Sequence, residues 1–539
     1  MIRARVSELH LLAAIAIASM LSVSAFAKTL TVTGTGEPAS IGSASCPANN
    51  CPTLRDAINA AISNDTITFA NGINGRTIAL SMASNDLSAS SIEFGASAFF
   101  ISDGAGEVTG KNLTIDGSGH AITIARDSAA APFRLFDVAS KSSLTLRGVT
   151  LRGGLAQGGN SKGGGGALGA GGAIFNQGTL TLDSAALLDN AVFGGSGGIG
   201  TGAANGGGGA GADATSADGG GPNGGTAGAP PRTGGFGGGG GTTTDTANFP
   251  GANGGFGGGG GKGGSGIGGG NGGFGAGGGS DAFIPGNGGF GGGKSSGDFD
   301  HVPNGGGGGG MGGAIFNDAG VVSAVNTTFH GNAATGGNTT YGGTPVAGGN
   351  GSGLGGAIFN YAGTVTLGFV TLAGNFTATG TGGEGGNADG GAIYSYADAA
   401  CGVNDGNLCG GGEADLTLVN SIAANSVGST SDIVIDGSGG TVASSGAGNL
   451  IKTQTGFAGS FINSDPRLGA LSPYLASGAA ETLPIGTNSP ARDAAASCKD
   501  AKNQTVASDA RGKARPQGGS CDIGAYEFDG DYIFANSFD

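Results

Sequence analysis

A short motif, Gly-Gly-Ala-Ile followed by Phe or Tyr, recurs four times and constrains the fold more than any other feature. The copies begin at residues 171, 312, 355 and 390. An Asn closes each of the first three units, 19, 20 and 20 residues after the first glycine, at Asn190, Asn332 and Asn375. Units of about 20 residues cannot bury an apolar face alone, so they bury it by stacking on their neighbours. The repeat therefore predicts a solenoid.

Within each unit, apolar and small polar residues alternate with a period of two, as in Thr179-Leu180-Thr181-Leu182. This alternation predicts short strands, and the Gly and Asn residues between them predict corners. Such coils form a parallel β-helix whose strands stack about 4.8 Å apart. Earlier strands are predicted at Leu113–Asp116, Ala121–Ile124, Phe133–Val138, Leu144–Leu146 and Val149–Leu151.

Two ladders are expected from this register. The isoleucines of the motif should stack inward, with the preceding glycines allowing corners at positive φ. The asparagines after the motif should stack at turn positions, because Asn tolerates the left-handed conformation. The expected ladders are Ile174, Ile315, Ile358 and Ile393, and Asn176, Asn317 and Asn360.

Residues 191–311 form a long insertion dominated by glycine, with Gly-Gly-Phe repeated at Phe236, Phe256, Phe274 and Phe290. So little apolar surface is not expected to offset the entropy of ordering a packed core. We interpret the tract as a flexible surface loop. An alternative is a Phe-Gly surface for self-association. Shorter Gly-rich loops at 333–354 and 376–389 indicate that the tract is an expanded version of one recurring loop.

Residues 1–27 are typical of a signal peptide, with Arg3 and Arg5, an apolar stretch at 11–23 and Ala25-Phe26-Ala27 before Lys28. Residues 28–539 contain no further long apolar run, so no transmembrane segment is expected in the mature chain. The predicted location is secreted, or associated with the outer membrane or cell surface.

Composition excludes several classes of protein. Charged residues are 11% of the chain and glycine supplies 126 of 539 residues, which is not typical of a globular enzyme. The net charge of −15 argues against nucleic acid and anionic membranes as partners. Trp is absent, which weakens the case for an aromatic sugar-binding platform.

Six cysteines in an exported chain favour disulfides. Proximity pairs Cys46 with Cys51, Cys401 with Cys409, and Cys498 with Cys521, although six cysteines allow 15 pairings. No pair has the spacing of a zinc or redox site, and the chain contains only four histidines. No metal or cofactor is therefore expected.

No catalytic residues are assigned from the sequence. Residues 288–295 match the P-loop pattern, but the strand before it and the helix after it are not predicted. A charged group on neighbouring predicted coils is interpreted as surface salt bridges; its members are Arg134, Asp137, Lys141, Arg147 and Arg152. His120 is interpreted as a turn residue, and His301 and His330 are isolated.

Both ends of a solenoid expose its core and need caps. Thr53 and Asp56 are typical of a helix start, and the helix at 53–62 should cover the first coil, tied by Cys46–Cys51. At the other end, residues 451–528 should form a cap held by Cys498–Cys521. Its ion pairs are expected among Asp509, Arg511, Arg515, Asp522 and Glu527.

These segments resemble known families of exported proteins. Residues 51–61 resemble the CSLREA motif, and the GGAI units resemble the repeats of chlamydial polymorphic outer-membrane proteins. The segments at 465–468, 489–493, 509–516 and 521–527 resemble the choice-of-anchor Q domain. The resemblance implies a single-stranded right-handed parallel β-helix at the cell surface, with no established catalytic residues. The chain ends soon after Glu527 without an autotransporter barrel, which argues against self-export.

The expected organisation is a signal peptide (1–27), a cap and first coils (28–190), the Gly-rich insertion (191–311), further coils (312–450), a C-terminal cap (451–528) and a tail (529–539). Three functions stay open. The leading one is a non-enzymatic, adhesin-like surface protein whose surface or matrix ligand is unknown. The others are a polysaccharide lyase or glycosidase on a pectate-lyase-like β-helix, and a self-assembling structural protein.

Overall fold

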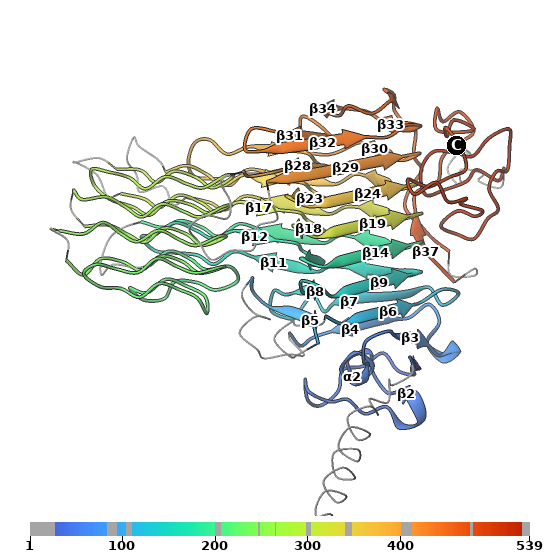
Figure 1. Ribbon diagram of the computed structural model, residues 1–539, viewed down its shortest axis with the longest axis horizontal. Helices are drawn as coiled ribbons and strands as arrows, with labels where there is room; N and C mark the ends of the chain where they lie inside the picture. The colour runs from blue at the N-terminus through green and yellow to red at the C-terminus, as the bar shows by residue number, and fades with distance from the viewer. Residues whose placement is uncertain are drawn as a thin grey trace, which may run out of the picture.

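The computed structural model is a solenoid of short parallel strands with a Gly-rich bundle projecting from one corner (Figure 1). It describes residues 27–83, 94–103, 110–199, 206–245, 248–264, 266–297, 303–339, 348–399, 412–474 and 478–530. Residues 1–26 of the predicted signal peptide, the Cys401–Cys409 pairing, His301 and residues 531–539 of the tail lie outside the described residues.

Three long sheets run along the solenoid, and the strand pairs within them are parallel. Sheet A contains β2 (Asn50–Cys51), β1 (Thr29–Val32), β3 (Asp65–Phe69), β6 (Asn112–Asp116), β9 (Ser143–Arg147), β14 (Thr179–Asp183), β19 (Val321–Val325), β24 (Thr364–Gly368), β29 (Glu413–Val419) and β32 (Thr441–Ser445). Sheet B contains β4 (Thr77–Leu80), β7 (Ile122–Arg126), β10 (Val149–Arg152), β15 (Ala186–Leu188), β20 (Thr328–His330), β25 (Thr371–Ala373), β30 (Ile422–Ala424), β33 (Asn449–Ile451) and β35 (Phe461–Ile462). Sheet C contains β5 (Ser97–Ile101), β8 (Arg134–Val138), β13 (Ile174–Asn176), β18 (Ile315–Asp318), β23 (Ile358–Tyr361), β28 (Ile393–Tyr396), β31 (Ile433–Asp436) and β34 (Gln454–Thr455).

Two short sheets complete the central coils and frame the Gly-rich loops. Sheet D contains β11 (Leu155–Gln157), β16 (Ala191–Phe193), β21 (Ala333–Thr335) and β26 (Phe376–Ala378). Sheet E contains β12 (Gly169–Ala170), β17 (Gly310–Met311), β22 (Gly353–Leu354) and β27 (Ala388–Asp389). A coil visits sheets C, A, B and D in turn and returns through E, so the predicted parallel β-helix is confirmed. All five predicted early strands are present, as β6 to β10.

The inward isoleucine ladder is confirmed. Ile174 pairs in register with Ile315, Ile315 with Ile358, and Ile358 with Ile393. All four are fully buried in one apolar core that runs through the solenoid. Alternation places the next residue of each strand on the outer side, so the Phe or Tyr of each motif packs in a second apolar cluster.

The two glycines of the motif have different roles. The first glycine of each copy, for example Gly355, has a positive φ of 65° and makes the corner. The second permits a close approach of the backbones: a Cβ on Gly172 would lie 2.2 Å from the carbonyl oxygen of Gly313 in the next coil. Both positions therefore disfavour any side chain.

The asparagine ladder is confirmed, but its physical basis differs from the expected one. The Asn176 amide donates to Asn317 Oδ1 (2.7 Å), and the Asn317 amide donates to Asn360 Oδ1 (2.8 Å). None of the three has a positive φ; Ala319 and Ala362 take the left-handed position instead. The side chains thus bond one another between coils, as buried amides require.

A second amide ladder follows sheet B. The Asn190 amide donates to Asn332 Oδ1, and the Asn332 amide donates to Asn375 Oδ1, both at 2.9 Å. These are the asparagines that close the repeat units, and all three are fully buried. Each coil therefore contributes one asparagine to this ladder.

The N-terminal helix α2 (Leu54–Ala60) covers the first coil as predicted. The Thr53 hydroxyl accepts from the Asp56 amide and donates to the Asp56 carboxylate (2.7 Å). Leu54, Ala57 and Ile58 enter the central core, whereas Ile62, beyond the helix, is exposed. The Cys46–Cys51 disulfide is present beside η1 (Pro47–Asn49); a second short 3-10 turn is η2 (Asn71–Ile73).

The C-terminal segment (residues 463–530) lies along the side of the coils, not only over their end (Figure 1). Its hairpin, β36 (Ser472–Tyr474) and β37 (Ala479–Thr482), reaches back to β10 and β15. The Ala525 amide donates to Thr371 Oγ1 in β25 (2.9 Å), and Asn420 donates to the Ser497 carbonyl (2.8 Å). The Cys498–Cys521 disulfide is present within it. The predicted end cap is thus largely a lateral cover for sheet B.

Four Gly-rich loops leave the solenoid after sheet D and return through sheet E. They span residues 158–168, 194–309, 336–352 and 379–387. Backbone hydrogen bonds join neighbouring loops, for example from Gly195 to Ala167 (2.8 Å) and from Gly337 to Gly308 (2.6 Å). The long tract is therefore an expanded copy of one recurring loop, as predicted. The described parts of these loops form the Gly-rich bundle.

The bundle is ordered by backbone hydrogen bonds that repeat every three residues. Gly277 and Ser280 both donate to one neighbouring segment, at Gly166 and Gly163. Between them, Gly278 donates to Gly293 and Gly279 to Gly270, in two other segments. Three residues per turn without internal bonds is the geometry of a polyproline-II helix. The segment 277–280 therefore bonds neighbours on three sides.

The prediction of a flexible loop is wrong for the described part of this tract. A Cβ on Gly259 would lie 2.0 Å from the Gly165 carbonyl oxygen, and one on Gly277 would lie 2.0 Å from that of Gly306. Backbones without side chains approach closely enough for their amides and carbonyls to pair across segments. The prediction counted apolar side chains and left out this contribution from the backbone.

We expect Gly259→Ala to destabilise the bundle by about 1–3 kcal/mol, because the methyl group overlaps a backbone carbonyl that cannot move alone. Hydrogen exchange should show faster exchange of bundle amides with the solenoid core unchanged. Gly72→Ala is the control, since a Cβ there meets nothing within 4 Å. Equal exchange in both variants would contradict the close-packed bundle.

Candidate functional site

Two aromatic stacks join the Gly-rich bundle to the solenoid. On the outer side of sheet C, Phe175, Phe316, Phe359 and Tyr394 stack with centroid separations of 5.5, 5.3 and 5.5 Å. The four phenylalanines of the Gly-Gly-Phe repeats form a second stack, with separations of 5.4, 4.9 and 5.5 Å. Tyr361 and Tyr396 lie between the stacks, for example with Phe274–Tyr361 at 4.4 Å. Because these rings face the solenoid, the proposed Phe-Gly self-association surface is wrong.

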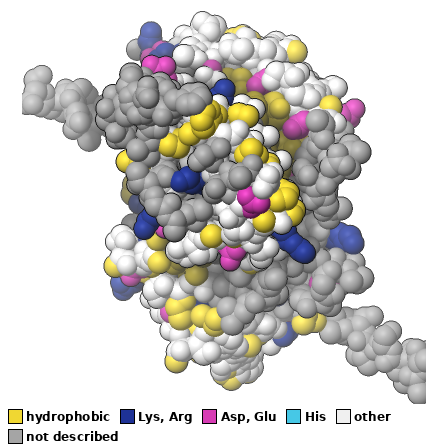
Figure 2. All heavy atoms as spheres, turned by 90° about the vertical axis from the view of Figure 1, so that its left-hand side faces the viewer, with side chains coloured by type: hydrophobic (Ala, Val, Ile, Leu, Met, Phe, Trp, Pro, Cys, Tyr) yellow, Lys and Arg dark blue, Asp and Glu magenta, His cyan; other side chains and the backbone are white. Residues whose placement is uncertain are grey.

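The opposite ends of the bundle segments form an exposed apolar tip. Ile267 and the pair Phe283-Ile284 lie between successive Gly-Gly-Phe turns, so they sit away from the solenoid. Their exposed fractions are 36%, 42% and 56%. The Gly266 and Gly268 backbones border Phe283 and Ile284, which places the two tips side by side. Figure 2, viewed from the bundle side, shows hydrophobic side chains exposed among mostly uncharged ones.

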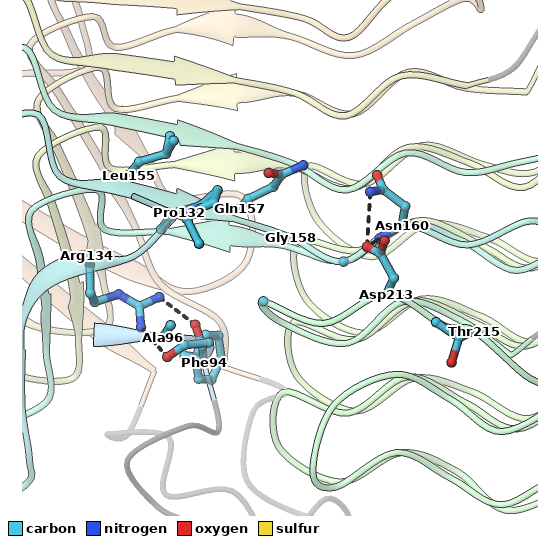
Figure 3. Close-up of a pocket in the computed structure, with 15 residues that line it drawn as sticks. Phe94, Ala96, Pro132, Arg134, Leu155, Gln157, Gly158, Asn160, Asp213 and Thr215 are labelled. Atoms are coloured by element: carbon cyan, nitrogen blue, oxygen red, sulfur yellow. Dashed lines mark hydrogen bonds between the residues drawn. The ribbon is translucent and has the colours of Figure 1, made fainter. Parts of the chain in front are cut away.

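A cleft of about 430 Å³ opens where the bundle meets the first complete coils (Figure 3). Phe94, Pro132 and Leu155 give it apolar walls, and Gln157, Asn160, Asp213 and Thr215 give it a polar side. Asp213 Oδ1 accepts from the Asn160 amide nitrogens of the backbone (2.7 Å) and side chain (3.0 Å). The cleft is not predictable from the sequence, because its walls come from three separate coil segments and a distant Gly-rich loop.

Arg134 forms the floor of this cleft and is not the surface residue that we predicted. It is 1% exposed, and its guanidinium donates to the carbonyls of Phe94, Gly95 and Ala170. Burial lowers its pKa, an effect that Asp137 opposes. Since these bonds occupy most of its donors, Arg134 anchors the chain before β5 to sheet E and is not placed as an anion receptor.

The other members of the predicted charged group lie in different places and have different partners. Asp137 is buried, whereas Lys141 is exposed. Arg147 pairs with Asp183 (3.7 Å), and Arg152 pairs with Asp189 (3.5 Å) and Glu481 (2.9 Å). The surface salt bridges are thus confirmed for the two arginines, and the structure does not bring the five residues into one cluster.

The ion pairs predicted in the C-terminal segment are confirmed. Arg511 pairs with Asp509 (2.7 Å) and Arg515 with Glu527 (2.8 Å), all nine-tenths buried or more. Arg511 also lies 3.6 Å from the Tyr526 ring centroid. Burial raises the pKa of Asp522 to about 6. These groups bond one another and nearby backbone, so their arrangement is structural.

The remaining candidates occupy ordinary positions. Residues 288–295 lie in the bundle, and Ser295 donates to the Gly286 carbonyl instead of opening a helix. His120 is in a turn against Asn74, and His330 bonds the Ala373 carbonyl. Within the described ranges, no group of three or more His, Cys, Asp and Glu side chains is placed to bind a metal ion. In those same ranges, no helix has the length and hydropathy needed to cross a bilayer.

Comparisons with known proteins add little. No protein-family model matches the chain, and no curated protein matches it. The crystal structure of pectate lyase Pel9A aligns with 93% of this chain and 97% of that one, at 11% identity and a TM-score of 0.22. This likeness is too weak to carry an argument about function. The parallel β-helix is established by the sheet topology and strand register.

Asp318 is a buried acid beside the aromatic junction. It lies in register with Tyr361, and its carboxylate accepts from the Gln177 amide (2.8 Å). Burial raises its pKa from 3.8 to about 6. The folded chain therefore retains a proton that the unfolded chain releases between these values. This group lowers the stability as the pH rises from about 4 to about 6, and the loss persists above that range.

We expect Asp318→Asn to be more stable than the parent by roughly 2–3 kcal/mol at pH 7.5, because the variant has no buried charge to ionise. The difference should disappear below pH 4. Denaturant unfolding at several pH values measures it, and subtracting the parent curve removes the parallel contribution of Asp522. Asp415→Asn, which changes an exposed acid of β29, is the control. An Asp318→Asn variant that is less stable at pH 7.5 would show that the carboxylate is stabilising when charged.

Proposed function

We propose that this chain is an exported cell-surface protein of adhesin-like function, which contacts another surface or a matrix through its Gly-rich bundle. The observation that carries the proposal is the apolar tip of Ile267, Phe283 and Ile284, which is exposed on an ordered bundle. Exposed apolar patches on soluble proteins mark interaction sites more often than chance.

The construction of the bundle supports a binding role. Its segments are cross-linked by backbone hydrogen bonds, and its base is fixed by the two aromatic stacks. A tip held in this way loses little conformational entropy when it binds. A flexible loop of the same composition would lose much more.

Export is part of the same proposal. The two disulfides favour an oxidising compartment. The first 27 residues are interpreted as a signal peptide, and the resemblance to cell-surface families points to the same location. An amino-terminal sequence of the secreted protein starting at Lys28 would support it.

A polysaccharide-cleaving activity is less favoured by the cleft in Figure 3. Glycosidases use two carboxylates on opposite sides of the bond that they cleave. Among the residues that line this cleft, Asp213 is the only acid, and Asn160 binds one of its oxygens. The cleft has the size and mixed lining of a binding site.

We expect the triple variant I267S/F283S/I284S to attach at least tenfold less well than the parent. Burying one such side chain contributes about 1.5–3 kcal/mol, and 1.4 kcal/mol corresponds to tenfold in affinity. The measurement is attachment of protein-coated beads to cultured cells, bacterial cells and matrix-protein films. The control is F193S/F376S, which alters exposed phenylalanines on sheet D.

Two outcomes count against the proposal. One is a parent protein that attaches to none of these surfaces. The other is equal attachment by the tip variant and the parent. Light scattering of the same samples reports oligomeric state, and a tip variant that only loses self-association would favour the structural alternative.

A further inference from the structure

An unbroken column of hydroxyl groups runs along the outer face of sheet A. Each member pairs in register with the next across nine strands, from β1 to β32. Its members are Thr29, Thr66, Thr114, Thr145, Thr181, Ser323, Thr366, Thr417 and Ser445.

The sequence builds this column through a repeated apolar-Thr-apolar pattern. In β14, Leu180 and Leu182 enter the core while Thr181 between them faces outward. Stacked strands lie about 4.8 Å apart, so eight steps span about 38 Å. Threonine is stiff at χ1, which restricts the direction of the hydroxyl at the seven threonine positions. The result is a linear array of hydrogen-bonding groups with a constant repeat.

The C-terminal segment turns the middle of this face into a groove. A cavity of about 290 Å³ lies between Thr181 and Ser323 on one side and Asp500, Lys502 and Gln504 on the other. Lys502 and Gln504 are exposed. The opposing wall therefore adds an ammonium, an amide and a carboxylate to the hydroxyl column.

Ser323 lies in the wall of the groove. It is 8% exposed and lines the cavity. Within the described ranges, its hydroxyl makes no hydrogen bond with the protein. Its oxygen is not fully buried and is open to the cavity, where it can bond a partner. A ligand lying in the groove would supply one.

The charge of the groove constrains the ligand. Arg147 and Asp183 pair with each other at 3.7 Å. Other charged groups near the column include Asp116, Asp415, Asp500 and Lys502, which leave a net negative charge. The whole chain carries −15. A polyanion would be repelled, whereas a neutral polymer rich in hydroxyl groups would not.

We propose that this groove binds a linear neutral polysaccharide, with the chain lying along the solenoid axis. A sugar chain presents hydroxyl donors and acceptors once per residue, and the column presents matching groups once per coil. The proposal deepens the surface-binding function above by naming a ligand class, and it rests on that function only for its biological setting. The site is separate from the bundle tip.

Threonine also favours strands because it is β-branched, whatever it binds. Substitution by valine separates the two explanations, since valine keeps the shape and the strand preference but removes the hydroxyl. The test variant is T145V/T181V/T366V. The control is T77V/T226V/T244V, which removes three exposed hydroxyls outside the groove. Circular dichroism and thermal unfolding verify that both variants fold like the parent.

The experiment measures depletion of the full mature chain from solution by insoluble cellulose, chitin, starch and a β-1,3-glucan, with polygalacturonate gel as the acidic comparison. We expect the parent and the control to bind at least one neutral polymer, and the groove variant to bind it at least tenfold more weakly. The proposal is overturned by a parent that binds none of the neutral polymers, by stronger binding to polygalacturonate, or by unchanged binding of the groove variant. The tip variant I267S/F283S/I284S should retain polysaccharide binding. The experiment therefore tests the groove proposal independently of the proposal for the apolar tip.

Discussion

The structure depends on parallel pairing in exact register, which places like residues of successive coils above one another. One register determines the inward isoleucines, the two amide ladders, the outer aromatic stack and the hydroxyl column. A shift of one residue would turn the core face outward on every strand. The buried asparagines make such a shift costly, because each amide would lose its partner in the next coil.

The Gly-rich bundle also depends on this register, because the register determines where its loops leave the solenoid. Because all four loops leave from one corner, their segments start close together and side by side. Glycine then lets the backbones bond directly, and the Gly-Gly-Phe turns add rings against the aromatic stack of sheet C. The solenoid thus positions a projection that contains little apolar core of its own.

The polar and apolar groups of this solenoid fall into two classes: those bound within the protein and those left exposed for binding. Buried charged groups such as Arg134, Arg511 and Arg515 bind backbone carbonyls, carboxylates and aromatic rings. These contacts hold neighbouring segments together. Groups left available are uncharged or weakly charged: the apolar tip, the mixed cleft and the hydroxyl groove. This division favours binding by shape and hydrogen bonding over binding by charge.

The amino-acid sequence by itself determined the parallel β-helix, its inward Ile174 ladder, the stacking of Asn176, the helix start at Thr53 and the Cys46 and Cys498 disulfides. These features follow from local periodicity and proximity, which a sequence displays directly. Only the tertiary structure decided the order of the bundle, the burial of Arg134, the lateral position of residues 463–530 and the groove beside Ser323. Each of these arises where segments distant in sequence meet through backbone groups. Backbone amide and carbonyl groups are nearly the same in every residue. A side-chain pattern therefore does not predict which of them form hydrogen bonds between distant segments.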